Sequence, residues 1–302
     1  MTFTALVVAL PLLTAQPTYT AQPAFGGPEI HWTAPGMFVQ GQPYKVHVEI
    51  VAPKEGTVVA SWLLGPSAFT IDGKGLGKRE DAGTLTLPSG FRVEGDVDLA
   101  AYLPADTAEF KLGYASEVAD SPPVVVKALQ AAPTGLDFMK MPAADLSKYH
   151  VVLETNQGNL EVEFWPDDAP NHVRNFRDLA YTGFYDGTTF QRVIPGFMIQ
   201  GGDPTGTGTG DGKRRLKAEF NKRKHEAGVL SMARSSNPDS ASCQFFVMHA
   251  RSPHLDGQYS AFGKLTSGID VVEKIVKVKR NASDKPNEPQ KIVKARVVVA
   301  PA

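Results

Sequence analysis

Alternating apolar and polar positions dominate the first half of the chain. Residues 44–50 alternate strictly, as a strand with one buried face does. Further apolar runs recur about every ten residues, with turn residues between them. This spacing is typical of a small β-sandwich, and we predict one over residues 28–128. The runs expected to be strands are 44–50, 58–64, 68–71, 83–87, 91–93 and 110–112.

The second half contains a hairpin pattern and two helical patterns. Residues 151–155 and 160–164 alternate on either side of a short glycine turn, which indicates an antiparallel pair. From Pro170 to Gly183, apolar residues recur at helical spacing, with the proline at the first helical position. Residues 269–276 predict a second helix. Two helices among many short strands favour a closed barrel with helical caps, so the predicted fold is mainly β.

A segment rich in proline and alanine separates the two patterns. We predict a linker over residues 129–147 and a second domain over residues 148–299. The charge changes across this segment. The first 145 residues contain nine Lys and Arg against fifteen Asp and Glu, and the rest contain 22 against 17. The difference supports a domain boundary and is too small to indicate a nucleic-acid partner.

The amino terminus begins with an apolar run over residues 4–13. Such a run is too short to span a bilayer and has the length of a signal-peptide core. We predict a signal peptide over residues 1–21, with cleavage after Ala15 or Ala21, and export to the periplasm or envelope. Because no Lys or Arg precedes the run, a cytoplasmic protein is the alternative. Nothing else in the sequence is apolar enough to predict a membrane span.

Composition limits the class of protein to which the chain can belong. The chain has 302 residues, of which 42% are hydrophobic and 21% are charged, so a globular protein with two domains is expected. Cys243 is the single cysteine, which excludes an intrachain disulfide and a cysteine-based zinc site. Its apolar neighbours predict a buried, inert thiol. The oligomeric state stays open.

Three polar segments invite a functional interpretation that their spacing does not support. The glycine-rich loop 206–213 lacks the residues of a phosphate-binding loop, so we interpret it as solvated and flexible. His225-Glu226 begins like a zinc-protease helix, but Val229 stands where the second histidine is required, and no metal is predicted. The basic stretch 213–224 is expected to be a solvated surface, with an acidic partner as the alternative.

Residues 190–203 contain the most informative motif. Arg192 precedes a Pro-Gly turn, an apolar run at 197–199 and then Gln200. In an extended segment, alternation places Met198 and Gln200 on one face. The guanidinium is permanently charged and lies near an apolar surface that carries one amide. Such a site suits a ligand that is mostly apolar and has a carbonyl group that can accept a hydrogen bond. A prolyl peptide has this chemistry.

Three further motifs follow in order: LSMA at 230–233, QFF at 244–246, and LDGQYSAFGK at 255–264. Together with the arginine motif, they make residues 149–297 resemble the cyclophilin family of peptidyl-prolyl cis-trans isomerases. The resemblance implies an eight-stranded antiparallel barrel with a helix over each end and a groove on its outer face. It also implies isomerisation of X-Pro bonds in client proteins, without a covalent intermediate, cofactor or metal.

The resemblance assigns roles to individual residues. Arg192 is the implied catalytic arginine, and Gln200 is the amide that helps to position it and the substrate. The implied proline pocket consists of Phe197, Met198, Phe246 and Leu255. The implied neighbouring groove and rim consist of Met232, Ala233, Arg234, Gln244, His254 and Tyr259. His254 stands where well-known members have a tryptophan that contacts cyclosporin, so drug sensitivity stays open. Arg234 replaces an asparagine and adds a charge beside the groove.

Other functions fit parts of the same sequence. Each apolar site residue, taken singly, could be an ordinary residue of the barrel core. Arg192, taken singly, could belong to a surface ion pair. The groove could bind proline segments with little turnover, as a module targeted by the sandwich. Alternatively, the sandwich itself could bind carbohydrate or protein, although residues 30–130 contain no aromatic cluster or charged constellation that specifies a ligand.

Overall fold

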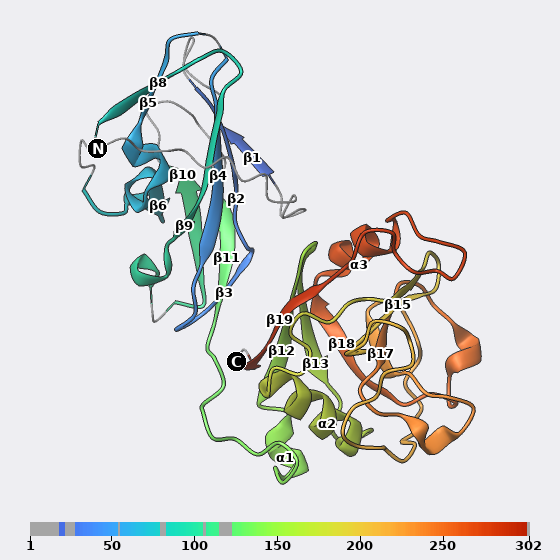
Figure 1. Ribbon diagram of the computed structural model, residues 1–302. Coiled ribbons are helices and arrows are strands. Elements are labelled where there is room, and N and C mark those ends of the chain that lie inside the picture. Colours follow the sequence, from blue (N-terminus) through green and yellow to red (C-terminus); the bar gives the residue numbers. More distant parts are fainter. Residues whose placement is uncertain are drawn as a thin grey trace.

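A β-sandwich precedes a β-barrel with helical caps in the computed structural model (Figure 1). The structure describes residues 18–21, 28–53, 55–78, 83–104, 107–114 and 123–300. The predicted mainly-β fold is confirmed, including the eight-stranded antiparallel barrel and the N-terminal sheets. The apolar run predicted to be a signal-peptide core lies outside the described residues.

Two sheets of the sandwich share one apolar core. Trp32 from one sheet meets Phe69 from the other edge to face, with ring centroids 5.9 Å apart. The first sheet has the order β1 (Thr18–Ala21), β2 (Glu29–Thr33), β4 (Lys45–Val51), β9 (Arg92–Asp98). The second has the order β3 (Met37–Val39), β11 (Val124–Leu129), β10 (Glu109–Tyr114), β6 (Phe69–Ile71), β7 (Lys74–Gly75). A separate ribbon pairs β5 (Thr57–Ala60) with β8 (Thr84–Leu87).

The strand expected over residues 58–64 is wrong beyond Ala60. There the chain enters two short 3₁₀ helices, η1 (Ser61–Leu64) and η2 (Pro66–Ala68). Pro66 begins η2, where its missing N–H costs no hydrogen bond. A third 3₁₀ helix, η3 (Ala100–Tyr102), follows β9.

The second domain is built on one eight-stranded sheet. The strand order is β14 (Arg192–Ile194), β15 (Met198–Gly201), β17 (Phe245–Met248), β16 (Val229–Met232), β18 (Ala261–Ser267), β13 (Gly158–Phe164), β12 (Tyr149–Thr155), β19 (Ile292–Val299). The bridge between Thr189 and Lys291 joins the two ends of this order and closes the barrel. Short 3₁₀ turns, η4 (Pro238–Ser240) and η5 (Pro253–Leu255), lie in the connecting loops.

Helices α2 (Pro170–Tyr181) and α3 (Ile269–Val276) lie at opposite ends of the barrel (Figure 1). Both helices were predicted, and Pro170 is at the first position of α2. Gly268 precedes α3 with φ of 101°, and a Cβ there would lie 2.3 Å from the Asn159 carbonyl oxygen. Only glycine satisfies both conditions, which accounts for the sharp entry into α3.

The segment predicted as a linker, 129–147, is packed against the barrel. Phe138 is fully buried in the barrel core and contacts Tyr181 edge to face. Tyr181 also donates its hydroxyl to the Pro133 carbonyl over 2.7 Å. A short helix, α1 (Ala143–Leu146), ends this segment and buries Leu146. The segment therefore adds to the core of the second domain.

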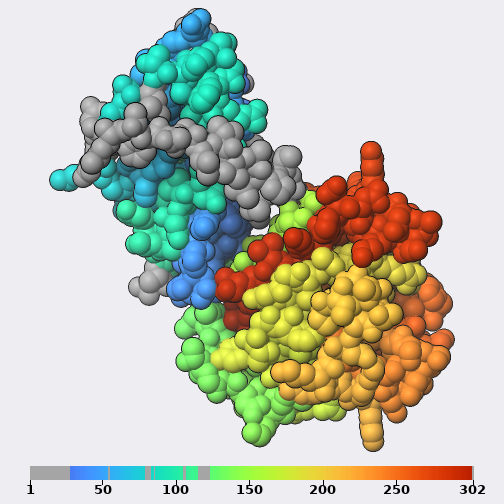
Figure 2. Space-filling view, in the orientation of Figure 1, coloured from blue at the N-terminus to red at the C-terminus, as the bar shows by residue number. Residues whose placement is uncertain are grey.

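The sandwich and the barrel are in direct contact, and Figure 2 shows them as two touching lobes. Glu161 on β13 is fully buried between Lys127 on β11, at 2.7 Å, and His150 on β12, at 3.1 Å. Burial alone would raise the pKa of Glu161, but the hydrogen bonds from His150 and Lys127 outweigh it and lower the pKa. Val152 on β12 adds an apolar contact with Val39 and Leu129. A charged group and apolar side chains thus join the domains.

Candidate active site

A row of aligned residues crosses four neighbouring barrel strands. Arg192 is paired with Gln200, Gln200 with Phe246, and Phe246 with Ser231. Directly paired residues of antiparallel strands project their side chains from the same face. The row therefore brings the guanidinium of Arg192 and the ring of Phe246 to one face of the sheet, with the amide of Gln200 between them.

That face is the outside of the barrel. Met198 and Phe246 belong to an apolar cluster distinct from the barrel core, whereas the intervening Ile199 and Phe245 belong to the core. We call this set the outer cluster. Its buried members are Met198, Val229, Phe246, Met248, Leu255 and Ala261, and its partly buried members are Trp165, Ile194, Phe197, Ala233 and Tyr259. The four residues of the implied proline pocket are therefore brought together.

Two implied rim residues lie against this cluster. The ring of Tyr259 meets Phe246 edge to face at 5.8 Å, and the ring of His254 lies 5.7 Å from Phe197. Phe197 is only partly buried, whereas Phe246 is 5% exposed. The outer cluster therefore presents a shallow apolar surface with aromatic edges.

A buried histidine supports Phe246 from behind. The ring of His225 stacks on Phe246 at 6.2 Å, and its Nε2 and Nδ1 atoms lie 3.1 Å from Ser231 Oγ and 3.2 Å from Asp256 Oδ1. Burial lowers the pKa of His225 despite the opposing effect of Asp256. Ser231 and His225 are fully buried and have no access to a substrate, whereas Asp256 is partly exposed and also pairs with Arg251. Their contacts fix the rear of the outer cluster.

Arg192 has an ion partner that the sequence did not reveal. The guanidinium Nε lies 3.9 Å from Asp284 Oδ2, and the Arg192 side chain is 47% exposed. Gln200, expected to position Arg192, instead donates to Gln244 Oε1 over 3.0 Å. Asp284 lies 92 positions further along the chain in an irregular loop, where no periodicity or motif marks it as a partner of Arg192.

A groove with a cavity of about 570 Å³ adjoins the outer cluster. Three of the implied groove residues, Ala233, Arg234 and Gln244, line it together with Gln200. Asp211, Arg215 and Asp239 add charge to its wall, so the groove is far more polar than the outer cluster. An apolar surface beside a polar groove can bind a peptide in which an apolar residue is followed or preceded by polar ones.

The assignment of Met232 to the groove is wrong. Its side chain is 1% exposed and packs in the barrel core, opposite Phe245, which is also a core residue. Alternation along β16 explains this, because Leu230 and Met232 share the inner face while Ser231 faces outward. The Met232 side chain cannot contact a ligand in the groove.

The guanidinium of Arg234 packs on Tyr259 and is hydrogen bonded to two loop carbonyls. Its guanidinium carbon lies 4.4 Å from the centre of the Tyr259 ring. The Nη atoms donate to the carbonyls of Ser235, at 2.8 Å, and Gln258, at 3.0 Å. The side chain therefore links two loops around the site, and its backbone remains beside the groove.

The glycine-rich loop is bound to the site. Asp203 is fully buried and accepts the N–H groups of Thr205, Gly208 and Gly210. Burial alone would raise the pKa of Asp203, but a hydrogen bond from the Thr205 hydroxyl and those from the three N–H groups lower it. Gln244 donates to the carbonyls of Gly208 and Gly210, at 3.0 and 2.9 Å. The loop is largely exposed, as the predicted solvated loop requires, and a buried carboxylate and a groove amide bind its backbone.

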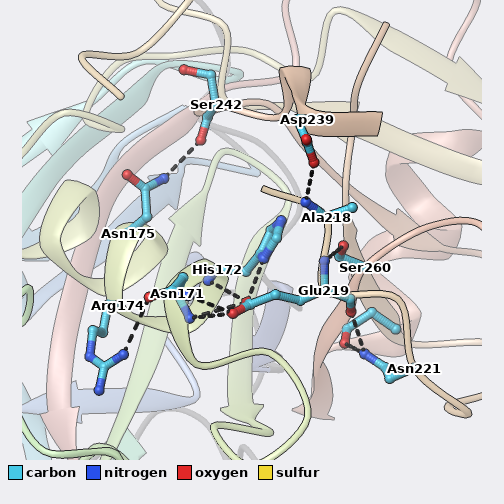
Figure 3. Close-up of polar contacts among 11 residues, drawn as sticks. Asn171, His172, Arg174, Asn175, Ala218, Glu219, Asn221, Asp239, Ser242 and Ser260 are labelled. Carbon is cyan, nitrogen blue, oxygen red and sulfur yellow. Dashed lines mark hydrogen bonds and ion pairs between the residues drawn. The ribbon is translucent and has the colours of Figure 1, made fainter. Parts of the chain in front are cut away.

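A second loop near the groove is fixed to the start of α2. Figure 3 shows Glu219 reaching Asn171 and His172, whose backbone N–H groups it accepts. Its carboxylate also lies 2.6 Å from His172 Nδ1. The Ala218 N–H donates to Asp239, which lines the groove. The Glu219 contacts thereby connect a capping helix with the groove wall.

Basic residues between 213 and 224 are partly neutralised by carboxylates on neighbouring elements. Arg214 pairs with Asp178 at 2.7 Å, and Arg223 pairs with Asp168 at 2.8 Å. Arg223 also lies 4.4 Å from the ring centre of Trp165. These contacts tie the stretch to the barrel, which weakens the alternative of a free patch for an acidic partner.

Cys243 is fully buried, and burial raises the pKa of its thiol to about 11. Neither property favours a reactive thiolate.

Within the described part of the chain, no three His, Cys, Asp or Glu side chains gather in a way that would hold a metal ion. The described helices include none that is both long and apolar enough to cross a membrane.

Known proteins resemble the second domain closely. Residues 150–297 match the family described as cyclophilin type peptidyl-prolyl cis-trans isomerase/CLD. Peptidyl-prolyl cis-trans isomerase-like 1 of Gibberella zeae is 44% identical over 154 residues, which are 49% of this chain and 94% of the relative. The chain belongs to the cyclophilin-type peptidyl-prolyl cis-trans isomerases.

Two further proteins are similar to part of the chain. Peptidyl-prolyl cis-trans isomerase B of Bacillus subtilis is 51% identical over 113 residues, covering 37% of this chain and 78% of the relative. A Cryptosporidium parvum cyclophilin, solved in the presence of the dipeptide Ala-Pro, is 34% identical with a TM-score of 0.48, covering 51% of this chain and 99% of its own. The family match places the cyclophilin domain at residues 150–297 of the chain.

Proposed function

We propose that Arg192 catalyses the prolyl isomerisation of this family by stabilising the twisted state of an X-Pro peptide bond. The observation that carries the proposal is the cross-strand row in which Arg192, Gln200 and Phe246 share one face. Phe197, Met198, Phe246 and Leu255 would hold the proline ring. The substrate class is accordingly an X-Pro segment of a client protein, whose refolding the reaction would assist.

The physical argument starts from the peptide bond. Its partial double-bond character gives a rotational barrier of about 18–20 kcal/mol. In the twisted state conjugation is lost, and the prolyl nitrogen becomes a better hydrogen-bond acceptor. A guanidinium that donates to this nitrogen stabilises the twisted state more than either planar isomer, which is differential binding of the transition state. Because about 1.4 kcal/mol corresponds to a factor of ten in rate, one charged hydrogen bond would supply roughly one to two decades.

The apolar surface and the arginine have separate roles in this proposal. A proline ring held by the outer cluster stays fixed while the acyl side of the bond rotates. Arginine suits the donor role because it remains protonated at all working pH values and its donors form a rigid fork. Activity should accordingly vary little between about pH 7 and 9, because a guanidinium keeps its charge across this range.

An NMR exchange assay on a short X-Pro peptide tests the function. Wild-type protein should accelerate exchange, and Arg192→Ala should lose most of this effect while still binding the peptide. Arg192→Lys is the matched control for charge, and it should recover only part of the rate because lysine lacks the rigid fork. A wild-type protein that binds without accelerating exchange would instead support the proline-binding module.

We also propose that the protein is exported. The apolar run at residues 4–13 supports this. Of the two predicted cleavage points, Ala15 is favoured, because cleavage after Ala21 would remove β1, which pairs with β2. Mass spectrometry of the mature amino terminus from fractionated cells tests both points. An intact Met1 in the cytoplasmic fraction would contradict export.

A further inference from the structure

We propose that His249 is a positioning residue that holds the turn between β14 and β15 in place for catalysis. The inference rests on the proposed function, because this hairpin carries Arg192, Phe197 and Gln200. His249 follows β17 directly, and its side chain is 21% exposed.

Three hydrogen bonds connect residues 249–250 to the turn. The His249 N–H donates to the Phe197 carbonyl over 2.9 Å, and the Ala250 N–H donates to the same carbonyl over 3.3 Å. The Gly196 N–H donates to His249 Nδ1 over 3.0 Å. The turn is therefore bound on both sides of the Gly196–Phe197 peptide, immediately before Met198.

The opposite edge of the imidazole is fixed to a capping helix. His249 Nε2 is hydrogen bonded to the Glu273 carboxylate on α3. Glu273 also pairs with Lys277 at 2.7 Å, and hydrogen bonds from Lys277 and His249 lower the pKa of Glu273. His249 thus bridges the turn and a helix that packs on the barrel end.

The protonation of the imidazole follows from its partners. Nδ1 must carry a lone pair, because Gly196 offers an N–H to it. Nε2 must carry the proton, because Glu273 presents a carboxylate oxygen. A neutral imidazole has one acceptor and one donor, and both are used here. Replacement of this ring therefore removes two specific bonds, and the acceptor at Nδ1 is the one that reaches the turn.

Loss of the acceptor should displace Phe197 and the hairpin that carries Arg192. Misplacement by about 1 Å can lower a rate by up to roughly a hundredfold, and one neutral hydrogen bond corresponds to about a fivefold effect. We expect a fall in kcat of roughly five- to thirtyfold for His249→Ala, with a smaller change in KM, because Phe246 and Leu255 lie outside the displaced hairpin and still hold the proline.

Two isosteric variants separate the roles of the ring atoms. In His249→Asn, Oδ1 occupies the place of Nδ1 and accepts the Gly196 N–H, but the side chain does not reach Glu273. In His249→Gln, the amide reaches towards Glu273 and offers no acceptor at the Nδ1 position. We expect Asn to restore most of the wild-type kcat and Gln to resemble Ala. His47→Ala, on the sandwich, is the matched control and should equal the wild type.

The experiment is X-Pro exchange in the full chain, together with the amide chemical shift of Gly196 by NMR. The Gly196 signal should keep its hydrogen-bonded shift in His249→Asn and lose it in His249→Ala and His249→Gln. Equal kcat in wild type, Ala and Gln would overturn the inference, and so would an Asn variant as impaired as Ala. Failure of the proposed function has a different signature, namely no exchange in the wild type or full exchange in Arg192→Ala.

Discussion

The Asp284 carboxylate lies 3.9 Å from Nε of Arg192, and the Asp284 carbonyl accepts the Val193 N–H over 2.8 Å. One residue therefore contacts the guanidinium and the backbone of the strand that carries it. Arg280 Nε lies 3.2 Å from the other carboxylate oxygen of Asp284. The geometry orients the arginine from its Nε edge and leaves the Nη groups for a substrate.

Asp284→Asn should lower kcat by up to roughly fivefold and leave KM nearly unchanged, because exposed ion pairs contribute at most about 1 kcal/mol. Asparagine is the appropriate replacement, since Asp284 has φ of 60° and asparagine tolerates this conformation. The measurement is X-Pro exchange at several peptide concentrations. Asp270→Asn, an exposed carboxylate on α3, is the control. A rise in KM with unchanged kcat would mean that Asp284 acts on binding and not on Arg192.

Phe245 and Phe246 form a matched pair on β17 that separates stability from activity. Phe245 packs in the barrel core and Phe246 in the outer cluster. We expect Phe246→Leu to lower kcat/KM at least tenfold, because the flat ring against the proline is lost. Phe245→Leu should lower the melting temperature and, while the protein is folded, retain kcat/KM within about threefold, roughly 0.7 kcal/mol. Equal loss of activity in both variants would argue against the outer cluster as the proline pocket.

The domain interface lies far from the site in the strand order. In the closed ring of eight strands, β12 is four places from β17, so Val152 at the interface and Phe246 are on opposite sides of the barrel. The described part of the sandwich therefore contacts the barrel on the side away from the outer cluster.

Lys127→Met should loosen the two domains without affecting catalysis. It leaves Glu161 fully buried with His150 as its remaining hydrogen-bond partner, and a buried carboxylate that loses its cation destabilises the contact between the domains. The expected result is greater protease sensitivity near residue 130, with kcat/KM within twofold of the wild type. Lys127→Met combined with Glu161→Gln removes the buried charge and should recover part of the resistance. A large loss of activity in Lys127→Met would indicate communication between the interface and the groove.

Sequence alternation anticipated much of the site, for a physical reason. Arg192, Met198 and Gln200 lie on one short hairpin, where a period of two fixes which side chains share a face. Met232 was misassigned because the resemblance names a position and not a side-chain direction. Leu230 and Met232, both apolar and two apart, already indicated a shared core face.

Contacts between distant segments cannot be predicted from any local pattern. Asp284 acts through a hydrogen bond and an ion pair, on a segment whose sequence shows only turn residues. Its partners are set by how the barrel closes, which brings the loop before β19 towards β14. His249 likewise has no helical or strand periodicity that relates it to Gly196. Such residues are recognised only once their distances are known.

Glu219 should make stability depend on pH in a defined window. Burial alone would raise the pKa of Glu219, but hydrogen bonds from His172 and from the Asn171 and His172 backbone lower it. The folded pKa is therefore below the unfolded value of about 4.3. The stabilisation is fully present above that value and is lost as the pH falls through the lowered folded pKa.

Glu219→Gln should accordingly lower the free energy of unfolding by about 1–2 kcal/mol at pH 7, because a charged cap on α2 and its contact with His172 are lost. Urea unfolding of wild type and variant from pH 7 to pH 3 checks this. The difference between them should be constant down to about pH 5 and shrink below about pH 4. Glu226→Gln, at an exposed position in the same loop region, should show neither the loss nor its pH dependence. A difference that persists unchanged at pH 3 would mean that the ionised carboxylate is not what stabilises the start of α2.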